Sequence, residues 1–241
     1  MSTKILQKRR DQVLEITLNY PEKLNCMGFG MLRALDDAVR HAEQDPEVRV
    51  LLIRGAGEKA FSTGADLTEF SSLSEKEADE WIALGHSVFN RIEGVRKPTV
   101  ALINGYAIGG GLELALACDF RAGTPSAVLA SVELQHGWLP GWGGMTRLRR
   151  LIGESRAKEV VMLCEKIPAA RALEMGLLSR VFEKGYDDPG CKALLDHLSG
   201  IQPEIFRQAK AILMDPDRTT AGKDVRFDML AMKTARKKIN R

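Results

Sequence analysis

The chain has 241 residues, of which 44% are hydrophobic and 28% charged. This composition excludes a disordered or fibrous protein and predicts a chain that buries a sizeable core. The net charge of +3 is too small to indicate nucleic-acid binding by itself. Eight Lys/Arg and three Asp/Glu fall within residues 217–241, so the basic character lies near the C-terminal end, where an exposed amphipathic helix also explains it.

The cysteine spacing predicts neither a zinc ribbon nor a redox pair nor a disulfide framework. Reduced thiols and a cytoplasmic location are therefore expected. The N-terminal residues are basic but lack the apolar stretch of a secretory signal. The most apolar segment, 99–118, contains Asn104 and Glu113 and falls short of a membrane span. The four cysteines are Cys26, Cys118, Cys164 and Cys191.

Short aliphatic strands alternate with helical patterns through the first two-thirds of the chain, which favours an α/β fold with mostly parallel pairing. The predicted strands are Val13–Leu18, Val50–Ile53, Thr99–Ile103, Asp119–Ala122, Val128–Ala130 and Leu178–Phe182. Apolar residues recur at helical spacing from Met31 to Ala42, and helices are also predicted at Glu80–Ile92, around Leu112–Ala117, and at Met145–Leu151, Ser155–Cys164, Ala169–Met175, Cys191–Leu198, Pro203–Met214 and Val225–Ile239.

One glycine pattern favours a nucleotide site only weakly. The predicted strand Val50–Ile53 is followed by Gly55-Ala56-Gly57, as in a dinucleotide fingerprint. A further glycine, Gly64, falls where the helix of that motif should already be established. The chain has no phosphate-binding P-loop and no GxSxG nucleophile motif. Its four histidines lack paired metal-ligand spacing, so no metal site is expected.

A triple glycine opening a helix is the strongest chemical signal in the sequence. In Gly109-Gly110-Gly111-Leu112-Glu113 the bare backbone lets a ligand approach, and the first-turn N–H groups have no helical acceptor. The helix dipole adds positive potential, which suits a developing oxyanion. Glu113 lies in the first turn and can face the same cleft. A tight helix–strand packing with Glu113 as a first-turn acid is the structural alternative.

Two other segments complete the pattern. Thr63-Gly64-Ala65-Asp66-Leu67 follows a Gly-rich turn, and Glu133 precedes the run 137–144, rich in glycine and tryptophan. Each alone is explained by a plain turn or a solvated loop. Together, in this order, the SxGADL, GGGxE and PGWGG segments resemble the crotonase (enoyl-CoA hydratase/isomerase) superfamily. The resemblance extends from Val13 to about Phe182 and includes the early turn 21–25.

The resemblance implies a ClpP/crotonase-like spiral of ββα units, with a core at 1–182 and a helical C-terminal region at 183–241 that is not independently folded. It implies an enzyme that binds acyl-CoA and stabilises an enolate. The N–H groups of Ala65 and Gly110 would form the oxyanion hole. Glu113 and Glu133 match the two acids of the hydratases, Glu113 activating water and Glu133 moving the C2 proton. One of two such neighbouring carboxyls would hold a proton near neutrality.

The family pattern also implies where coenzyme A binds. The residues expected near the substrate, mostly through backbone contacts, are Lys23, Leu24, Ser62, Ala65, Asp66, Leu67, Gly110 and Trp138. Lys223 or Arg226 would meet the phosphates. No cofactor is implied, because coenzyme A is part of the substrate. Trp138 and His136 depart from the usual small or aliphatic residues, which leaves the acyl group open; Trp138 either narrows the pocket for a short or flat acyl group or packs in the core.

Retention of both glutamates predicts an enoyl-CoA hydratase-type lyase, with a place in fatty-acid metabolism. An enoyl-CoA isomerase, or another enolate-forming enzyme of the superfamily, is the alternative, and a non-enzymatic RNA- or partner-binding role is a further one. Family members are usually trimers or dimers of trimers. We therefore expect a homotrimer or hexamer in which the C-terminal helix contributes to the interface or covers the active site, and we expect no membrane or nucleic-acid partner.

Overall fold

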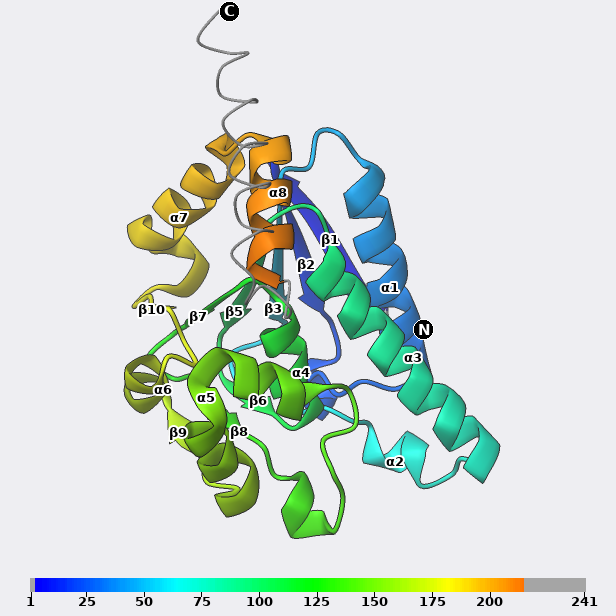
Figure 1. Cartoon of the computed structure of the whole chain (residues 1–241). Helices are drawn as coiled ribbons and strands as arrows, with labels where there is room; N and C mark the ends of the chain where they lie inside the picture. Colours follow the sequence, from blue (N-terminus) through cyan, green and yellow to red (C-terminus); the bar gives the residue numbers. More distant parts are fainter. Residues whose placement is uncertain (1–2, 215–241) are drawn as a thin grey trace, which may run out of the picture.

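The computed structural model describes residues 3–214, and its strands form two sheets (Figure 1). The larger sheet has the order β1-β2-β3-β5-β7-β10 and the smaller one β4-β6-β8-β9. The strands are β1 (Ile5–Arg10), β2 (Val13–Leu18), β3 (Val50–Gly55), β4 (Ala60–Ser62), β5 (Thr99–Ile103), β6 (Tyr106–Ile108), β7 (Phe120–Gly123), β8 (Val128–Ala130), β9 (Ile167–Pro168) and β10 (Arg180–Val181).

Helices follow the strand pairs. They are α1 (Phe29–Gln44), α2 (Leu67–Phe70), α3 (Glu75–Gly94), α4 (Gly110–Ala117), α5 (Gly144–Leu163), α6 (Ala169–Met175), α7 (Pro189–Gly200) and α8 (Pro203–Met214). Short 3-10 helices occupy Pro21–Lys23, Glu133–His136 and Gly185–Asp187. No helix in the described part of the chain is long and apolar enough to cross a membrane.

A repeated unit builds both sheets at once. β5, β6 and α4 form one unit, and β7, β8 and α5 form the next; β3, β4 and the helices α2 and α3 precede them. In each unit the first strand joins the larger sheet and the second joins the smaller one. Equivalent strands pair in parallel, β3 with β5 and β5 with β7, and β4 with β6 and β6 with β8. The predicted spiral of ββα units is therefore confirmed.

The central strands β2, β3, β5 and β7 of the larger sheet are buried on both faces, which explains why β3 and β5 are nearly continuous aliphatic runs. Along β3, Leu51 and Ile53 pack into the cluster with α1 and α3, whereas Val50 and Leu52 pack into a second cluster with α7. This alternation is the two-residue period of a strand. Figure 1 shows α1 and α3 side by side, away from α7.

A buried ion pair attaches α8 to this body. Lys210 is 8% exposed, and its Nζ lies 2.9 Å from Oδ1 of Asp119. The same ammonium donates to the carbonyl oxygen of Val95 at 2.7 Å. Asp119 in turn accepts the backbone N–H of Thr99 at the start of β5. Both partners are hydrogen-bonded, as a buried pair requires.

The structure differs from the sequence prediction mainly in short elements. β4 and β6 have three residues each and carry too little pattern to be recognised, and β1 is a strand that the sequence pattern does not predict. The predicted helix at Glu80 starts at Glu75, because Ser74 and Glu77 form a capping box. The predicted helix Val225–Ile239 lies outside the described residues.

Two predicted helices are one element with a kink. The helix α5 spans both predicted segments, but Gly153 within it has φ of +77°, a backbone conformation that suits glycine. The predicted boundary between Leu151 and Ser155 therefore marks a real interruption of helical geometry. The helices predicted at Ala169–Met175 and Pro203–Met214 are found with those bounds.

Candidate active site

The three sequence motifs meet at one edge of the smaller sheet. β4, β6 and β8 are parallel neighbours, so their carboxyl ends lie together. The SxGADL segment follows β4, the triple glycine follows β6, and Glu133 follows β8. They line a cavity of about 390 Å³, to which Ala65, Gly110, Glu113 and Glu133 all contribute. Its volume is within the usual range of ligand pockets.

Two backbone N–H groups are available at this cavity. Those of Ala65 and Gly110 have no hydrogen-bond acceptor within residues 3–214. The two segments touch through bare backbone: a Cβ on Gly64 would lie 2.6 Å from the nitrogen of Gly110. Gly64 also has φ of +85°. Glycine at 64 is therefore required both for the turn and for the approach of the two segments.

The first of these segments is held by a parallel β-bridge between Met27 and Ala65. The N–H of Met27 donates to the Gly64 carbonyl at 2.7 Å, and the N–H of Asp66 donates to the Met27 carbonyl at 3.2 Å. Because the bridge uses the groups on either side of Ala65, the Ala65 N–H is left for another acceptor. Asp66 then caps α2 by accepting the N–H groups of Thr68 and Glu69.

The second segment depends on the glycines that open α4. Gly109 has φ of +55° and ψ of −124°, a combination that a residue with a side chain rarely adopts. A Cβ on Gly111 would lie 2.0 Å from the carbonyl oxygen of Ser62. The start of α4 therefore packs directly on β4, and its first N–H groups and positive dipole end face the cavity.

Glu113 is the buried carboxylate of the site. It is 4% exposed, and its Oε1 accepts the backbone N–H of Trp142 at 2.9 Å and of Gly144 at 2.7 Å. Burial raises the pKa of Glu113 to about 7, against the lowering effect of these two hydrogen bonds. The negative charge of Glu133 also raises the pKa of Glu113. Glu113 therefore exchanges a proton near neutral pH.

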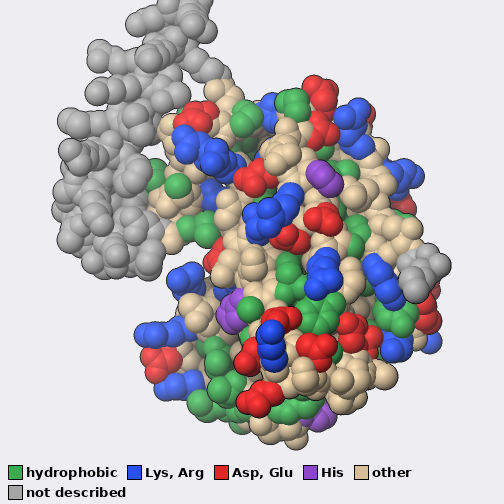
Figure 2. Space-filling model, turned by 90° about the vertical axis from the view of Figure 1, so that its right-hand side faces the viewer, with side chains coloured by type: hydrophobic (Ala, Val, Ile, Leu, Met, Phe, Trp, Pro, Cys, Tyr) green, Lys and Arg blue, Asp and Glu red, His purple; other side chains and the backbone are tan. Residues whose placement is uncertain are grey.

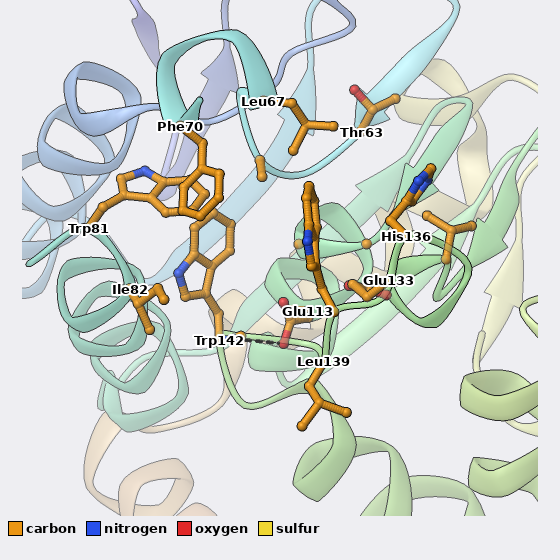
Figure 3. Close-up of a pocket in the computed structure, with 16 residues that line it drawn as sticks. Thr63, Leu67, Phe70, Trp81, Ile82, Glu113, Glu133, His136, Leu139 and Trp142 are labelled. Carbon is orange, nitrogen blue, oxygen red and sulfur yellow. Dashed lines mark hydrogen bonds between the residues drawn. The ribbon is translucent and has the colours of Figure 1, made fainter. Parts of the chain in front are cut away.

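Glu133 lies next to Glu113 in the cavity (Figure 3). Its Oε2 accepts the hydroxyl of Ser131 at 2.7 Å. Its Oε1 lies 3.2 Å from where a Cβ on Gly109 would stand. The two carboxyl groups thus share one cavity: Glu113 is held by the segment at the start of α5, and Glu133 by Ser131 of its own loop.

The residues predicted near coenzyme A divide into two groups. Leu67 and Trp138 line the cavity with Ala65 and Gly110. Lys23, Leu24, Ser62 and Asp66 do not. Ser62 is fully buried and donates to the Asn25 carbonyl at 2.8 Å, and Asp66 is 7% exposed. Burial therefore gives the side chains of Ser62 and Asp66 a role in shaping the loop.

Three further residues, Phe70, Trp81 and Ile82, line the cavity without being indicated by the sequence motifs. Phe70 lies on α2, which the sequence pattern does not predict, and the other two lie in the first part of α3, within the predicted helix that begins at Glu80. The capping box formed by Ser74 and Glu77 is the sequence signal for the start of α3 at Glu75. Trp81 lies on the buried face of this helix.

The described residues contain neither a cluster of metal ligands nor an exposed thiol. Among residues 3–214, no group of three or more His, Cys, Asp or Glu could hold a metal ion. All four cysteines are free and buried. Burial raises the pKa of the Cys26 thiol, beside Asp66, to about 12, so it is protonated at neutral pH.

Comparison with known proteins agrees with this geometry. The model of the enoyl-CoA hydratase/isomerase family matches residues 8–239. A short-chain-enoyl-CoA hydratase of Clostridium acetobutylicum is 36% identical over 179 residues, which are 74% of this chain and 69% of that protein. A crotonyl-CoA hydratase of Syntrophomonas wolfei is 38% identical with the same coverage.

A solved structure resembles the whole fold. The crystal structure of an enoyl-CoA hydratase from Bacillus anthracis superposes with a TM-score of 0.90 at 31% sequence identity, covering 95% of this chain and 90% of that one. The family match and these relatives confirm the resemblance drawn from the three motifs. The chain belongs to the enoyl-CoA hydratase/isomerase family of the crotonase superfamily and is an enzyme of the hydratase type.

Proposed function

We propose that the cavity adds water reversibly across the C2–C3 double bond of a 2-enoyl-CoA thioester. The thioester carbonyl would accept the N–H groups of Ala65 and Gly110. Addition of water at C3 places negative charge on that oxygen as the enolate forms, and preorganised donors stabilise such charge most. The unengaged N–H groups on two touching segments support this role.

The two glutamates divide the proton transfers. The two carboxyls hold one proton between them: Glu113 takes a proton from water as the water oxygen bonds to C3, and Glu133 gives the shared proton to C2. One proton then passes back between the carboxyls to restore the starting state. The pKa of Glu113, about 7, makes its ionised form a stronger base than an ordinary carboxylate. Oε1 of Glu113 is already engaged by two N–H groups, so Oε2 faces the water.

The coenzyme A part of the substrate would extend out of the cavity past Leu67, the first residue of α2. Leu67 is 46% exposed. Lys23 supports this path, because its side chain is 41% exposed and lies only 3.5 Å from Asp66 at the start of α2. The backbone of Leu24 is adjacent, since its carbonyl accepts the N–H of Thr63 at 3.1 Å. Lys223 and Arg226, the other candidates for the phosphates, lie outside the described residues.

The single observation that carries the proposal is the pairing of Glu113 and Glu133 beside two N–H donors that have no acceptor within residues 3–214. Loss of the conjugated absorbance of crotonyl-CoA on incubation with the protein tests it. An isomerase, the alternative enzyme, would instead move the double bond of a 3-enoyl thioester without adding water. Product analysis by mass separates the two, because hydration alone increases the mass of the thioester.

We also propose a homotrimer or a dimer of trimers, acting in the cytoplasm without a separate cofactor. Exposed apolar side chains along α5 support self-association: Met162 is 62% exposed and Leu163 58%. Light scattering on the full chain checks the assembly, and a monomer at micromolar concentration would contradict it. Acidic and basic side chains are intermixed over the face shown in Figure 2, so this face does not favour nucleic-acid binding, and the basic segment 217–241 lies outside the described residues.

A further inference from the structure

Aromatic side chains gather on one side of the cavity. The chain has only three tryptophans, and all three, Trp81, Trp138 and Trp142, line this cavity together with Phe70. They come from α2, α3 and the loop before α5, segments far apart in the sequence. Figure 3 shows Phe70, Trp81 and Trp142 together, with His136 and Glu133 across the pocket.

The four rings form one continuous wall. Ring centroids of Phe70 and Trp81 are 5.2 Å apart, those of Trp81 and Trp142 are 4.8 Å apart, and those of Phe70 and Trp138 are 5.9 Å apart. These tilted and edge contacts are the favoured arrangements of aromatic pairs. Trp142 and Trp81 are buried, whereas Trp138 is 43% exposed at the rim. The wall therefore runs from the interior to the mouth of the cavity.

The wall begins directly beside the reacting groups. Trp142 donates its backbone N–H to Glu113, and a Cβ on Gly110 would lie 2.4 Å from Cζ3 of the Trp142 ring. On its other side the same indole rests on Gly85 of α3, where a Cβ would lie 2.1 Å from Nε1. Trp142 is thus fixed between two glycines, one of which is Gly110, whose N–H is proposed to hold the thioester carbonyl.

We propose that the acyl group this enzyme takes carries an aromatic ring attached at or next to C3, packed against Phe70, Trp81 and Trp138. This substrate class rests on the proposed function of the site. The cavity has room for it, since about 150 Å³ suffices for benzene and this one has about 390 Å³. The exposed ring of Trp138 is one that a bound aromatic group would cover.

Aromatic packing separates this class from aliphatic acyl groups of equal size. A planar ring can present its edge or face to each of the wall rings, whereas a saturated ring of the same bulk cannot. Such pairs strengthen binding beyond area burial by up to about tenfold each. The preference should depend on Phe70 and Trp138 more than on Leu139, an aliphatic residue of the same cavity.

Binding of unreactive saturated thioesters tests the proposal without interference from differences in reactivity. Dissociation constants of 3-phenylpropanoyl-CoA and 3-cyclohexylpropanoyl-CoA are measured by calorimetry on the full chain. We expect the phenyl compound to bind about tenfold more tightly, the gain of one good aromatic pair. Phe70→Leu and Trp138→Leu should each reduce that ratio several-fold, while Leu139→Ala leaves the ratio unchanged. Circular dichroism shows that each variant is folded.

Equal or tighter binding of the cyclohexyl compound by the unmodified chain would overturn the inference. So would a phenyl preference that Phe70→Leu and Trp138→Leu both leave intact. Hydration of crotonyl-CoA is measured on the same preparation. If crotonyl-CoA is hydrated and no phenyl preference is found, the substrate class fails and the proposed function stands. If the phenyl preference is found without hydration of any enoyl thioester, the proposed function fails.

Discussion

Gly144 donates its backbone N–H to Oε1 of Glu113 at 2.7 Å, and it has no room for a side chain there. A Cβ at this position would lie 2.7 Å from Cγ of Glu113. The first residue of α5 thus fixes the carboxylate on α4, and the two helices pack together at this point. The orientation of Glu113 therefore depends on a glycine 31 residues away in the chain.

Gly144→Ala should lower kcat by about tenfold to a hundredfold, because the new methyl group displaces Glu113 from the position that holds water. Steady-state kinetics with crotonyl-CoA measures the effect. Gly94→Ala is the matched control, since a Cβ at Gly94 meets nothing within 4 Å. Equal kcat for the Gly144→Ala and Gly94→Ala variants would show that this contact does not position the carboxylate.

Glu113→Gln and Glu133→Gln should each lower the hydration rate by about 10²–10⁴-fold with the fold retained, because each removes one proton-transfer group. The amide oxygen introduced at position 113 would still accept the N–H groups of Trp142 and Gly144, so the loop should stay in place. Turnover close to that of the unmodified chain in either variant would remove that glutamate from the mechanism.

The pKa of Glu113 also predicts how stability depends on pH. A carboxyl whose pKa is raised on folding, here from 4.5 to about 7, favours the folded state while protonated. This contribution is complete below the unfolded-state pKa and is lost as pH rises through about 7. A shift of this size corresponds to about 3 kcal/mol.

Glu113→Gln removes this titration. Its free energy of unfolding, relative to that of the unmodified chain, should therefore increase by about 3 kcal/mol between about pH 4 and about pH 8. Urea unfolding at several pH values measures the difference. A constant difference across this range would mean that Glu113 has an ordinary pKa in the folded protein.

Arg147 supports the same loop from α5. Its Nη1 donates to the Trp142 carbonyl at 2.7 Å, and its Nη2 lies 2.8 Å from Oε2 of Glu93. Arg147→Met should destabilise the fold by about 3 kcal/mol, because it leaves a partly buried Glu93 without its main partner. The double variant Arg147→Met/Glu93→Gln should recover part of that loss in urea unfolding. No recovery would mean that the Arg147 contact with the loop carbonyl dominates.

The family and most of the long elements can be predicted from the sequence, because the motifs and the 3.6-residue periods are local patterns. The acids Glu113 and Glu133 are recognised for the same reason. The partners of Glu113 are not, since Trp142 and Gly144 approach it only through the packing of α5 on α4. The aromatic wall is only partly predictable, because α2 is four residues long and Trp81 follows a polar segment that is typical of a loop.

Hydration by the two glutamates is tested most directly by the fate of crotonyl-CoA in water enriched in ¹⁸O. Mass spectrometry of the thioester product after incubation with the full chain is the decisive measurement. We predict a hydroxyacyl-CoA that carries one ¹⁸O on C3, formed at a rate that Glu113→Gln and Glu133→Gln both reduce strongly. A product without the heavy oxygen, or no hydration of either crotonyl-CoA or the corresponding 3-phenyl enoyl-CoA, would contradict hydration by this pair of glutamates.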